Sequence, residues 1–406
     1  MTVAGRAISG LRAPLCRQDR RAYTRSGLRT LAQRSEAVKD RSLYLMSRRP
    51  TKRFLLTLLT LAFLPVIPLT AGSNPLPVRG LDLTAPKPDE LPLALRFIRD
   101  ALPKEGVNVL VMEFDYRYQY KSHPEVVDAD ALSEDQVKQI VAACHDAGVR
   151  LIPLINMLGH QSWDKQTFGL LRAHPEFDEA PGKYPTNQGI YCRSYCPRAA
   201  GVHAVVFDLI DELATACQAD AVHVGMDEVF LLGEDDCPRC RGMNKAELFA
   251  QEVRALHDHL AGTHREMWMW GDRFLDGDAT GLGKWEASIN GTAPAISLVP
   301  RDIVICDWHY EAAVPTAAYF AIQGFRVVAA PWQMPDVALN QLELVRRIRA
   351  ASTDALKSRT LGALQTTWCD LGDFVQAYYG EGSPTREGVK AAECFKALFR
   401  EIRQEE

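Results

Sequence analysis

Eight short β-rich apolar runs alternate with longer amphipathic runs along most of this chain, and this alternation restricts the fold more than any other feature. Each apolar run has the composition of a buried strand, and each intervening run has the period of a helix that buries one face. The predicted strands are 78–83, 107–114, 149–156, 221–225, 266–270, 303–307, 325–329 and 361–366. The predicted helices are 89–102, 133–147, 199–217, 244–260, 316–323, 339–356 and 387–403.

Strands that alternate with helices form parallel sheets, either closed in a (β/α)8 TIM barrel or open in a doubly wound fold. A doubly wound dinucleotide fold carries a glycine-rich phosphate loop after its first strand. The first predicted strand holds Arg79-Gly80-Leu81-Asp82, which is not that fingerprint. With eight strands, the sequence therefore favours a single α/β barrel over residues 73–406, and no organic cofactor is indicated.

The first 72 residues differ in composition from the rest. Residues 1–53 hold 14 Lys and Arg against 3 Asp and Glu, without apolar periodicity, so we expect no independent fold there. Residues 54–69 are almost wholly apolar, follow a basic flank and precede small residues, which is typical of a secretory signal peptide. Because Met46 stands where such a peptide begins, we expect 46–72 to be the signal peptide and 1–45 to be a mis-annotated or disordered extension.

Export and charge together restrict the partners of the chain. An uncleaved membrane anchor is the alternative to a signal peptide, but the apolar run is short for a span of about 20 residues. We therefore predict a periplasmic or secreted protein without stable membrane association. After residue 53 there remain 33 Lys and Arg and 48 Asp and Glu, a formal charge of −15. Such an acidic body repels phosphate backbones, so nucleic acid is not expected as a partner.

Acidic and aromatic residues gather at the predicted carboxyl ends of the strands, where (β/α)8 barrels carry their active sites. The fourth strand runs into two adjacent carboxylates, Asp227 and Glu228, and six of the seven tryptophans lie at or near strand ends or in the loops that follow. Any one tryptophan is equally well explained by core packing. As a set, aromatic rings stack on the C–H face of a sugar while carboxylates bind its hydroxyls and protonate a leaving oxygen. The pattern predicts a carbohydrate site.

The residues 222–229, Val-His-Val-Gly-Met-Asp-Glu-Val, carry a family resemblance. They resemble the His-x-Gly-x-Asp-Glu signature of glycoside hydrolase family 20, the β-N-acetylhexosaminidases. The continuation over 228–233, Glu-Val-Phe-Leu-Leu-Gly, is similar to the hexosaminidase D-like branch of that family. The resemblance extends over about 79–368, most of the mature chain.

The resemblance implies an exo-acting, retaining hydrolysis of terminal N-acetylglucosamine or N-acetylgalactosamine residues. The substrate's own 2-acetamido carbonyl would attack the anomeric carbon and form an oxazolinium intermediate, an exception to the two-carboxylate scheme. Glu228 would act as general acid and then as general base. Asp227 would orient the acetamido N–H and stabilise the oxazolinium charge, and His223 would support the pair by hydrogen bonding.

The same resemblance implies substrate-binding residues on the other strands. Strand six departs from the better-known members, because Ile305-Cys306-Asp307 stands where they place Tyr-x-Asp, so Tyr310 is expected to supply the tyrosine hydrogen bond to the acetamido oxygen. The predicted substrate-binding set is Arg79, Asp115, His160, His223, Trp270, Asp307, Tyr310, Trp332 and Trp368.

Two cysteine pairs lie in loops beside the predicted site, Cys192 with Cys196 and Cys237 with Cys240. Export to an oxidising compartment favours disulfides, so a disulfide or mixed structural role is the prediction. Four thiols at such spacings are also compatible with a zinc site, which stays open as the alternative.

Two other functions remain compatible with the sequence. The first is a barrel that binds glycans without hydrolysing them, since a fold alone does not ensure activity. The second is a glycosidase for sugars that lack the acetamido group, which would need an enzyme nucleophile about 5 Å from Glu228. Asp307 and Asp115 are the candidates for that nucleophile.

Overall fold

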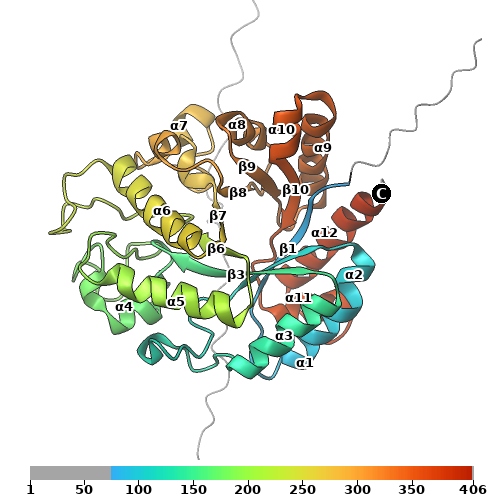
Figure 1. Ribbon diagram of the computed structural model, residues 1–406, viewed down its shortest axis with the longest axis horizontal. Coiled ribbons are helices and arrows are strands. Elements are labelled where there is room, and N and C mark those ends of the chain that lie inside the picture. The colour runs from blue at the N-terminus through green and yellow to red at the C-terminus, as the bar shows by residue number, and fades with distance from the viewer. Residues whose placement is uncertain (1–74, 405–406) are drawn as a thin grey trace, which may run out of the picture. The chain divides into compact units, whose positions relative to one another are not determined.

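The computed structural model describes residues 75–404, and over these residues eight parallel strands close into a barrel surrounded by helices (Figure 1). The strands follow one another around the barrel in the order β1-β10-β9-β8-β7-β6-β3-β2. Each of the eight predicted strands is present, so the (β/α)8 barrel is confirmed. They are β1 (Val78–Thr84), β2 (Val109–Glu113), β3 (Arg150–Met157), β6 (Ala221–Gly225), β7 (Glu266–Trp270), β8 (Val304–Trp308), β9 (Arg326–Ala330) and β10 (Thr360–Gln365).

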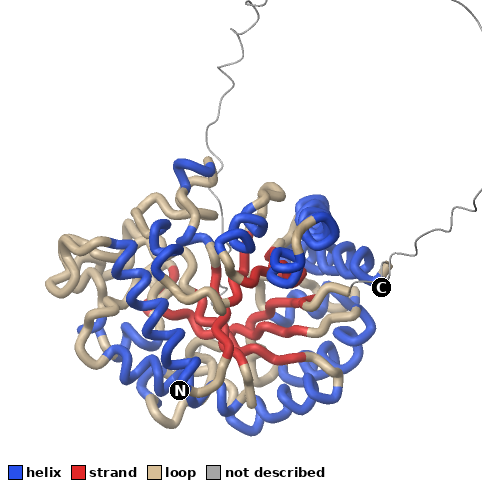
Figure 2. The backbone as a smooth tube through the Cα atoms, turned by 45° about the horizontal axis from the view of Figure 1, so that its top comes forward, coloured by secondary structure: helices blue, strands red, loops and turns tan. Residues whose placement is uncertain are grey.

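Helices form the outer layer and the strands lie at the centre (Figure 2). The α-helices are α1 (Leu91–Arg96), α2 (Leu102–Glu105), α3 (Glu134–Asp146), α4 (Gly169–Ala173), α5 (Val202–Ala216), α6 (Lys245–Gly262), α7 (Gly277–Thr280), α8 (Thr316–Gln323), α9 (Pro335–Ala351), α10 (Asp354–Arg359), α11 (Leu371–Tyr379) and α12 (Arg386–Arg403). Local sequence signals explain their ends: Ser133 forms a capping box with Gln136 at the start of α3, and α9 begins at Pro335, where the missing N–H is not needed.

Three helices differ from the prediction. The helix expected over 89–102 is interrupted by a π-helical turn at Phe97–Ala101 between α1 and α2. The helix expected over 339–356 ends at Ala351, because Thr353 caps a separate helix, α10, through the Leu356 amide. Helix α11 was not predicted, although its buried residues stand at helical spacing.

Strand alternation divides the apolar residues into two layers. In β8, Val304, Cys306 and Trp308 point into the barrel, whereas Ile305 and the preceding Ile303 pack in the outer core between the strands and the helices. The position of any polar side chain on a strand therefore decides whether it faces the barrel interior or the helical layer.

Two long loops at the carboxyl ends of β3 and β6 pack against each other. The β3 loop contains a small hairpin of β4 (Ser162–Trp163) and β5 (Gln166–Thr167), which the sequence did not predict. It returns to its own strand where the Tyr195 amide donates to the Leu158 carbonyl, at 2.9 Å. A Cβ at Gly159 would lie 3.0 Å from the Asp227 carbonyl oxygen, so the β6 loop passes directly over this point.

The extension over 1–45 and the signal peptide over 46–72 lie outside the described residues, and both stay predictions. Within residues 75–404, no helix combines the length and the apolar character that crossing a membrane requires.

Candidate active site

The backbone turns sharply where β6 ends, and this turn places the acidic pair. Gly225, Met226 and Glu228 all have left-handed φ angles, of 64°, 70° and 47°. Among the described residues, positive φ at non-glycine positions is concentrated after barrel strands, where backbone strain often marks functional sites. Six of the ten such residues lie there: Asp115, Leu158, His160, Met226, Glu228 and Trp368.

The turn brings both carboxylates to one imidazole. His160 Nε2 lies 3.2 Å from Asp227 Oδ2 and 3.3 Å from Glu228 Oε2. A regular strand would send neighbouring side chains to opposite faces, but here the pair converges because the backbone turns. Asp227 and Glu228 are 8% and 9% exposed, so the pair is largely withdrawn from water and the His160 imidazole lies against both carboxylates.

Charge stabilisation is mutual in this group of three. Burial alone would lower the pKa of His160, but the Asp227 carboxylate beside it outweighs burial and holds that pKa well above its usual value. Burial would likewise raise the pKa of Asp227, yet His160 keeps it below its usual value. The site therefore contains an ionised Asp227 next to an imidazolium at neutral pH.

Asp272, which follows β7, holds the backbone of Glu228. Its Oδ2 accepts hydrogen bonds from the Glu228 amide at 3.0 Å and from Arg273 Nε at 2.6 Å. Arg273 in turn donates to three carbonyls of the β7 loop, including Trp285 and Ala287. Burial raises the pKa of Asp272 to about 6, while Arg273 opposes the rise. Asp272 was not among the predicted site residues.

His223 lies inside the barrel beneath the turn. Its Nδ1 accepts a hydrogen bond from the Gly225 amide at 3.1 Å, which leaves the ring proton on Nε2. Burial lowers the pKa of His223 to about 3, so the ring is neutral. The hydrogen bond of His223 is made to the Gly225 backbone and not to Asp227 or Glu228. Any support that His223 gives to the acidic pair therefore acts through the turn. The ring also packs 4.5 Å from Trp270.

The four predicted aromatic residues come together from four strands. Trp368 lies 5.6 Å from Trp270, and its Nε1 donates to the Tyr310 hydroxyl at 2.5 Å. Tyr310 lies 5.3 Å from Trp332, whose Nε1 donates to the Thr367 carbonyl. Trp270 is only 1% exposed and forms the base of this group. The four side chains form one aromatic group, and their roles in stacking on a sugar stay predictions.

A second aromatic group lies near His160. Tyr191 packs edge-on against Trp163 at 4.8 Å and Trp285 at 4.9 Å, and also contacts Phe230 at 5.7 Å. Its ring is 6.0 Å from His160. Tyr191 was not predicted, because it stands in a loop whose path no periodic pattern predicts.

Buried carboxyl groups occupy β1 and β2 beside the acidic pair. Asp115 accepts from the Asn156 amide at 2.7 Å and from Asn156 Nδ2, which also donates to Glu113 at 2.9 Å. Burial, followed by repulsion from Asp115, raises the pKa of Glu113 to about 8. Burial and Glu113 also hold the pKa of Asp82 well above its usual value. This cluster keeps protonated carboxyls near the site, and only Asp115 was predicted.

The prediction for Arg79 is wrong. Its side chain donates to the Gly106 carbonyl at 2.7 Å and to the Leu76 carbonyl at 3.0 Å. These carbonyls lie at the amino ends of β1 and β2, opposite the acidic pair. Arg79 stands near the start of its strand, whereas the active end begins around Thr84, so a position on strand one did not guarantee the correct end.

The prediction for Asp307 as a substrate-binding residue or nucleophile is also wrong. Its neighbours Cys306 and Trp308 point into the barrel, so Asp307 faces the helical layer. There its carboxylate accepts from Thr316 of α8 at 2.8 Å and pairs with His309 at 3.2 Å. Burial would lower the pKa of His309, but Asp307 and Glu286 raise it to about 9. Asp307 therefore anchors α8.

The cysteine grouping needs a correction as well. All nine cysteines in residues 75–404 carry free thiols, so neither predicted sequence pair is joined there. Cys192 lies apart from the other three and contacts the Glu228 carbonyl, with its Sγ at 3.7 Å. Glu179 takes its place beside Cys196, Cys237 and Cys240.

The fold and the site together define a (β/α)8-barrel protein with an acid–base centre at the carboxyl ends of its strands. A model of the glycosyl hydrolase family 20 catalytic domain matches residues 111–346, and the chain belongs to this family. The more specific hexosaminidase D-like branch stays a prediction. No curated protein sequence matches the chain.

Solved structures support the fold. The chitobiase of Flavobacterium johnsoniae is 17% identical, with a TM-score of 0.55 over 81% of this chain and 51% of its own. An exo β-N-acetylglucosaminidase of Vibrio harveyi, solved with N-acetylglucosamine, is 17% identical with a TM-score of 0.54, covering 81% of this chain and 58% of its own. Another β-N-acetylhexosaminidase is 17% identical with a TM-score of 0.54, covering 81% of this chain and 76% of its own. This chain thus spans little more than half the length of the first two.

Proposed function

We propose that the chain is an exo-acting, retaining β-N-acetylhexosaminidase that uses substrate-assisted catalysis. The observation that carries the proposal is the convergence of Asp227 and Glu228 on His160. Two adjacent carboxylates that face one point suit a substrate whose own acetamido group is the nucleophile. Membership of family 20 supports the same reaction.

In the first step, the acetamido carbonyl oxygen bonds to the anomeric carbon while the bond to the leaving oxygen breaks. Glu228 gives its proton to that oxygen. The ionised Asp227 accepts a hydrogen bond from the acetamido N–H and stabilises the positive charge of the oxazolinium ring. His160 keeps Asp227 ionised.

In the second step, water attacks the anomeric carbon and passes a proton to the Glu228 carboxylate. The carbonyl oxygen leaves, the acetamido group is restored, and the configuration is retained. The Tyr310 hydroxyl accepts a hydrogen bond from Trp368 Nε1. Its own O–H can therefore donate a hydrogen bond to the acetamido oxygen.

The remaining carboxylates favour this mechanism over a protein nucleophile. Asp307 faces the helical layer, and Asp115 accepts two hydrogen bonds from Asn156. A glycosidase for sugars without an acetamido group would depend on one of them. A glycan-binding barrel without activity would not need the strained turn that makes the two carboxylates converge.

The substrate configuration and the location belong to the same proposal. We infer a terminal N-acetylglucosamine or N-acetylgalactosamine residue as substrate, and export through the signal peptide at 46–72. Fractionation of expressing cells checks the location: we expect the processed chain outside the cytoplasm, and an unprocessed cytoplasmic chain would contradict export.

A substrate panel tests the function. Purified protein is assayed with the 4-nitrophenyl β-glycosides of N-acetylglucosamine, N-acetylgalactosamine and glucose. We expect turnover of one or both acetamido sugars and very little of the glucoside. Equal turnover of the glucoside would contradict substrate assistance, and lack of turnover on all three would favour the glycan-binding alternative.

A further inference from the structure

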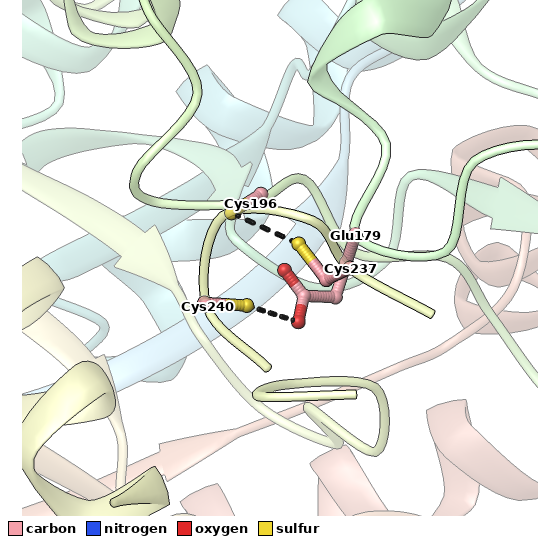
Figure 3. A group of neighbouring side chains, drawn as sticks. All are labelled: Glu179, Cys196, Cys237 and Cys240. Atoms are coloured by element: carbon pink, nitrogen blue, oxygen red, sulfur yellow. Dashed lines mark hydrogen bonds between the residues drawn. The ribbon is translucent and has the colours of Figure 1, made fainter. Parts of the chain in front are cut away.

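Four buried side chains outside the acidic pair meet at one point. Figure 3 shows Glu179 and Cys196 from the β3 loop pointing toward Cys237 and Cys240 from the β6 loop. One donor atom from each lies within 4.8 Å of all the others. Cys196 Sγ is 3.5 Å from Cys237 Sγ, and Cys240 Sγ is 2.8 Å from Glu179 Oε1. Each side chain is at most 1% exposed.

Backbone hydrogen bonds place these residues in advance. Asp178 pairs with Tyr195 in an antiparallel bridge, and the Glu179 amide donates to the Ser194 carbonyl, which sets Glu179 beside Cys196. The segment Cys237-Pro238-Arg239-Cys240 forms a turn in which the Arg241 amide donates to the Cys237 carbonyl at 3.2 Å. Two cysteines separated by two residues are typical of half a zinc site.

One carboxylate oxygen of the group is left without a partner. Glu179 is fully buried; its Oε1 accepts from the Glu234 amide at 3.1 Å and from Cys240, but its Oε2 has no hydrogen-bond partner within the described residues. Burial of a carboxylate oxygen without a partner is costly, and a bound cation would satisfy it. Arg239 interacts with Cys196 and Cys237, but its terminal nitrogens are engaged by the Glu176 and Asp178 carbonyls.

We propose that Glu179, Cys196, Cys237 and Cys240 bind one structural Zn²⁺ ion. Zinc bound at about 2.3 Å from each sulfur requires sulfur atoms about 3.8 Å apart in a tetrahedron, close to the spacing of Cys196 and Cys237. On binding, each of the three thiols forms a Zn–S bond and releases its proton to solvent. Four protein ligands complete the coordination, so the site is structural, and it goes beyond the glycosidase reaction.

The ion would join the two loops that build the active site. The β3 loop carries His160 and Tyr191, and the β6 loop begins with the acidic pair. Cys192, four residues before the ligand Cys196, already contacts the Glu228 carbonyl. A crosslink at the outer end of both loops would restrict their movement relative to each other. Zinc would therefore act at a distance, by positioning.

Metal analysis of the full chain tests the site. The protein is purified without chelators and its zinc is measured by elemental mass spectrometry. We expect about one ion per chain, and less than about a tenth of that in Cys240→Ala. Cys144→Ala is the matched control, because Cys144 is equally buried but lies on α3, outside the group. It should retain zinc.

Two further measurements separate the outcomes. Replacement by Co²⁺ should give the visible absorption bands of a tetrahedral thiolate complex in the wild type and not in Cys240→Ala. Mass spectrometry under non-reducing conditions detects the alternative, a Cys196–Cys237 disulfide with a mass lower by two hydrogens. That disulfide, or a zinc-free chain with three reactive thiols, would overturn the proposal. Because Glu228→Gln should keep its zinc, a failed glycosidase assay and a failed metal site remain distinguishable.

Discussion

Two groups of buried polar side chains include residues of the β6 loop, and they differ in what stabilises their carboxylates. At its start, Asp227 and Glu228 share the imidazolium of His160, at 3.2 and 3.3 Å. Further along, Cys237 and Cys240 meet a carboxylate, Glu179, whose Oε2 has no hydrogen-bond partner within residues 75–404. A neutral sugar adds no charge to the first group when it binds, whereas in the second group a metal ion would supply positive charge. What compensates a buried charge therefore indicates which ligand the group takes.

The largest effect expected is on proton transfer. Glu228→Gln removes the acid and base, and we expect kcat on the N-acetylglucosaminide to fall by about 10³-fold, with Asp227→Asn also severely impaired. Circular dichroism and zinc content should match the wild type. A Glu228→Gln variant that keeps more than a tenth of the activity would contradict the role of Glu228 as acid and base.

Loss of the internal cation should weaken both activity and stability. For His160→Gln we expect kcat/KM to fall by about a hundredfold, because Asp227 loses the charge that keeps it ionised. The zinc content should not change. A loss of zinc in this variant would mean that the two groups depend on each other.

The same pair predicts the pH dependence of stability. The raised pKa of His160 stabilises the fold fully below its unfolded value of about 6.5, and this contribution is lost as pH rises through the folded pKa. The lowered pKa of Asp227 contributes above about 3.9 and is lost as pH falls through the folded pKa. The Tm difference between wild type and His160→Gln should thus be largest between about pH 4 and 6.5. A Tm difference that shows no decrease as pH rises above about 6.5 would contradict the ion pair.

Support of the Glu228 backbone should have an intermediate effect. Asp272→Asn keeps an acceptor for the Glu228 amide but loses the charge that holds Arg273. We expect kcat to fall by about tenfold while KM changes little, since the residue positions the acid and does not contact substrate. Asp272→Glu, which restores the charge, should recover part of kcat. A change confined to KM would contradict this role.

Substitutions at two glycines of the β6 segment, one near each group, can be compared by their effect on stability alone. Gly225 (φ 64°) and Gly242 (φ 73°) have the same backbone strain, but a Cβ at Gly225 would lie 2.2 Å from Asn156 Oδ1, while a Cβ at Gly242 would have nothing within 4 Å. Gly225→Ala should lower the free energy of unfolding by about 1–3 kcal/mol more than Gly242→Ala. Denaturation in urea measures both. Equal losses would show that only φ matters at Gly225.

Local pattern was sufficient for the barrel and for its acidic pair. The strands are short runs of β-branched and apolar residues, and their number and alternation with helices leave few other folds. Asp227 and Glu228 could be found because both stand in one continuous motif at a strand end. Helix α11 and the β4–β5 hairpin were missed, since short elements give weak periodic signals.

Errors arose where the function of a residue depends on direction or on distant chain segments. Arg79 and Asp307 both stand on predicted strands, but one lies at the amino end and the other faces the helices. Pairing cysteines by sequence distance failed because Cys196 lies beside Cys237, 41 positions away, and Glu179 joins them.

The sequence by itself determined the eight strands, the barrel and the position of the acidic pair, because these follow from hydrophobic period and from neighbouring residues. Only the tertiary structure decided that His160 contacts both carboxylates, that Asp272 holds Glu228, and that a carboxylate completes the cysteine group. Each of these contacts joins loops of different strands. Their meeting depends on strand register and loop path, which arise from packing of the whole barrel.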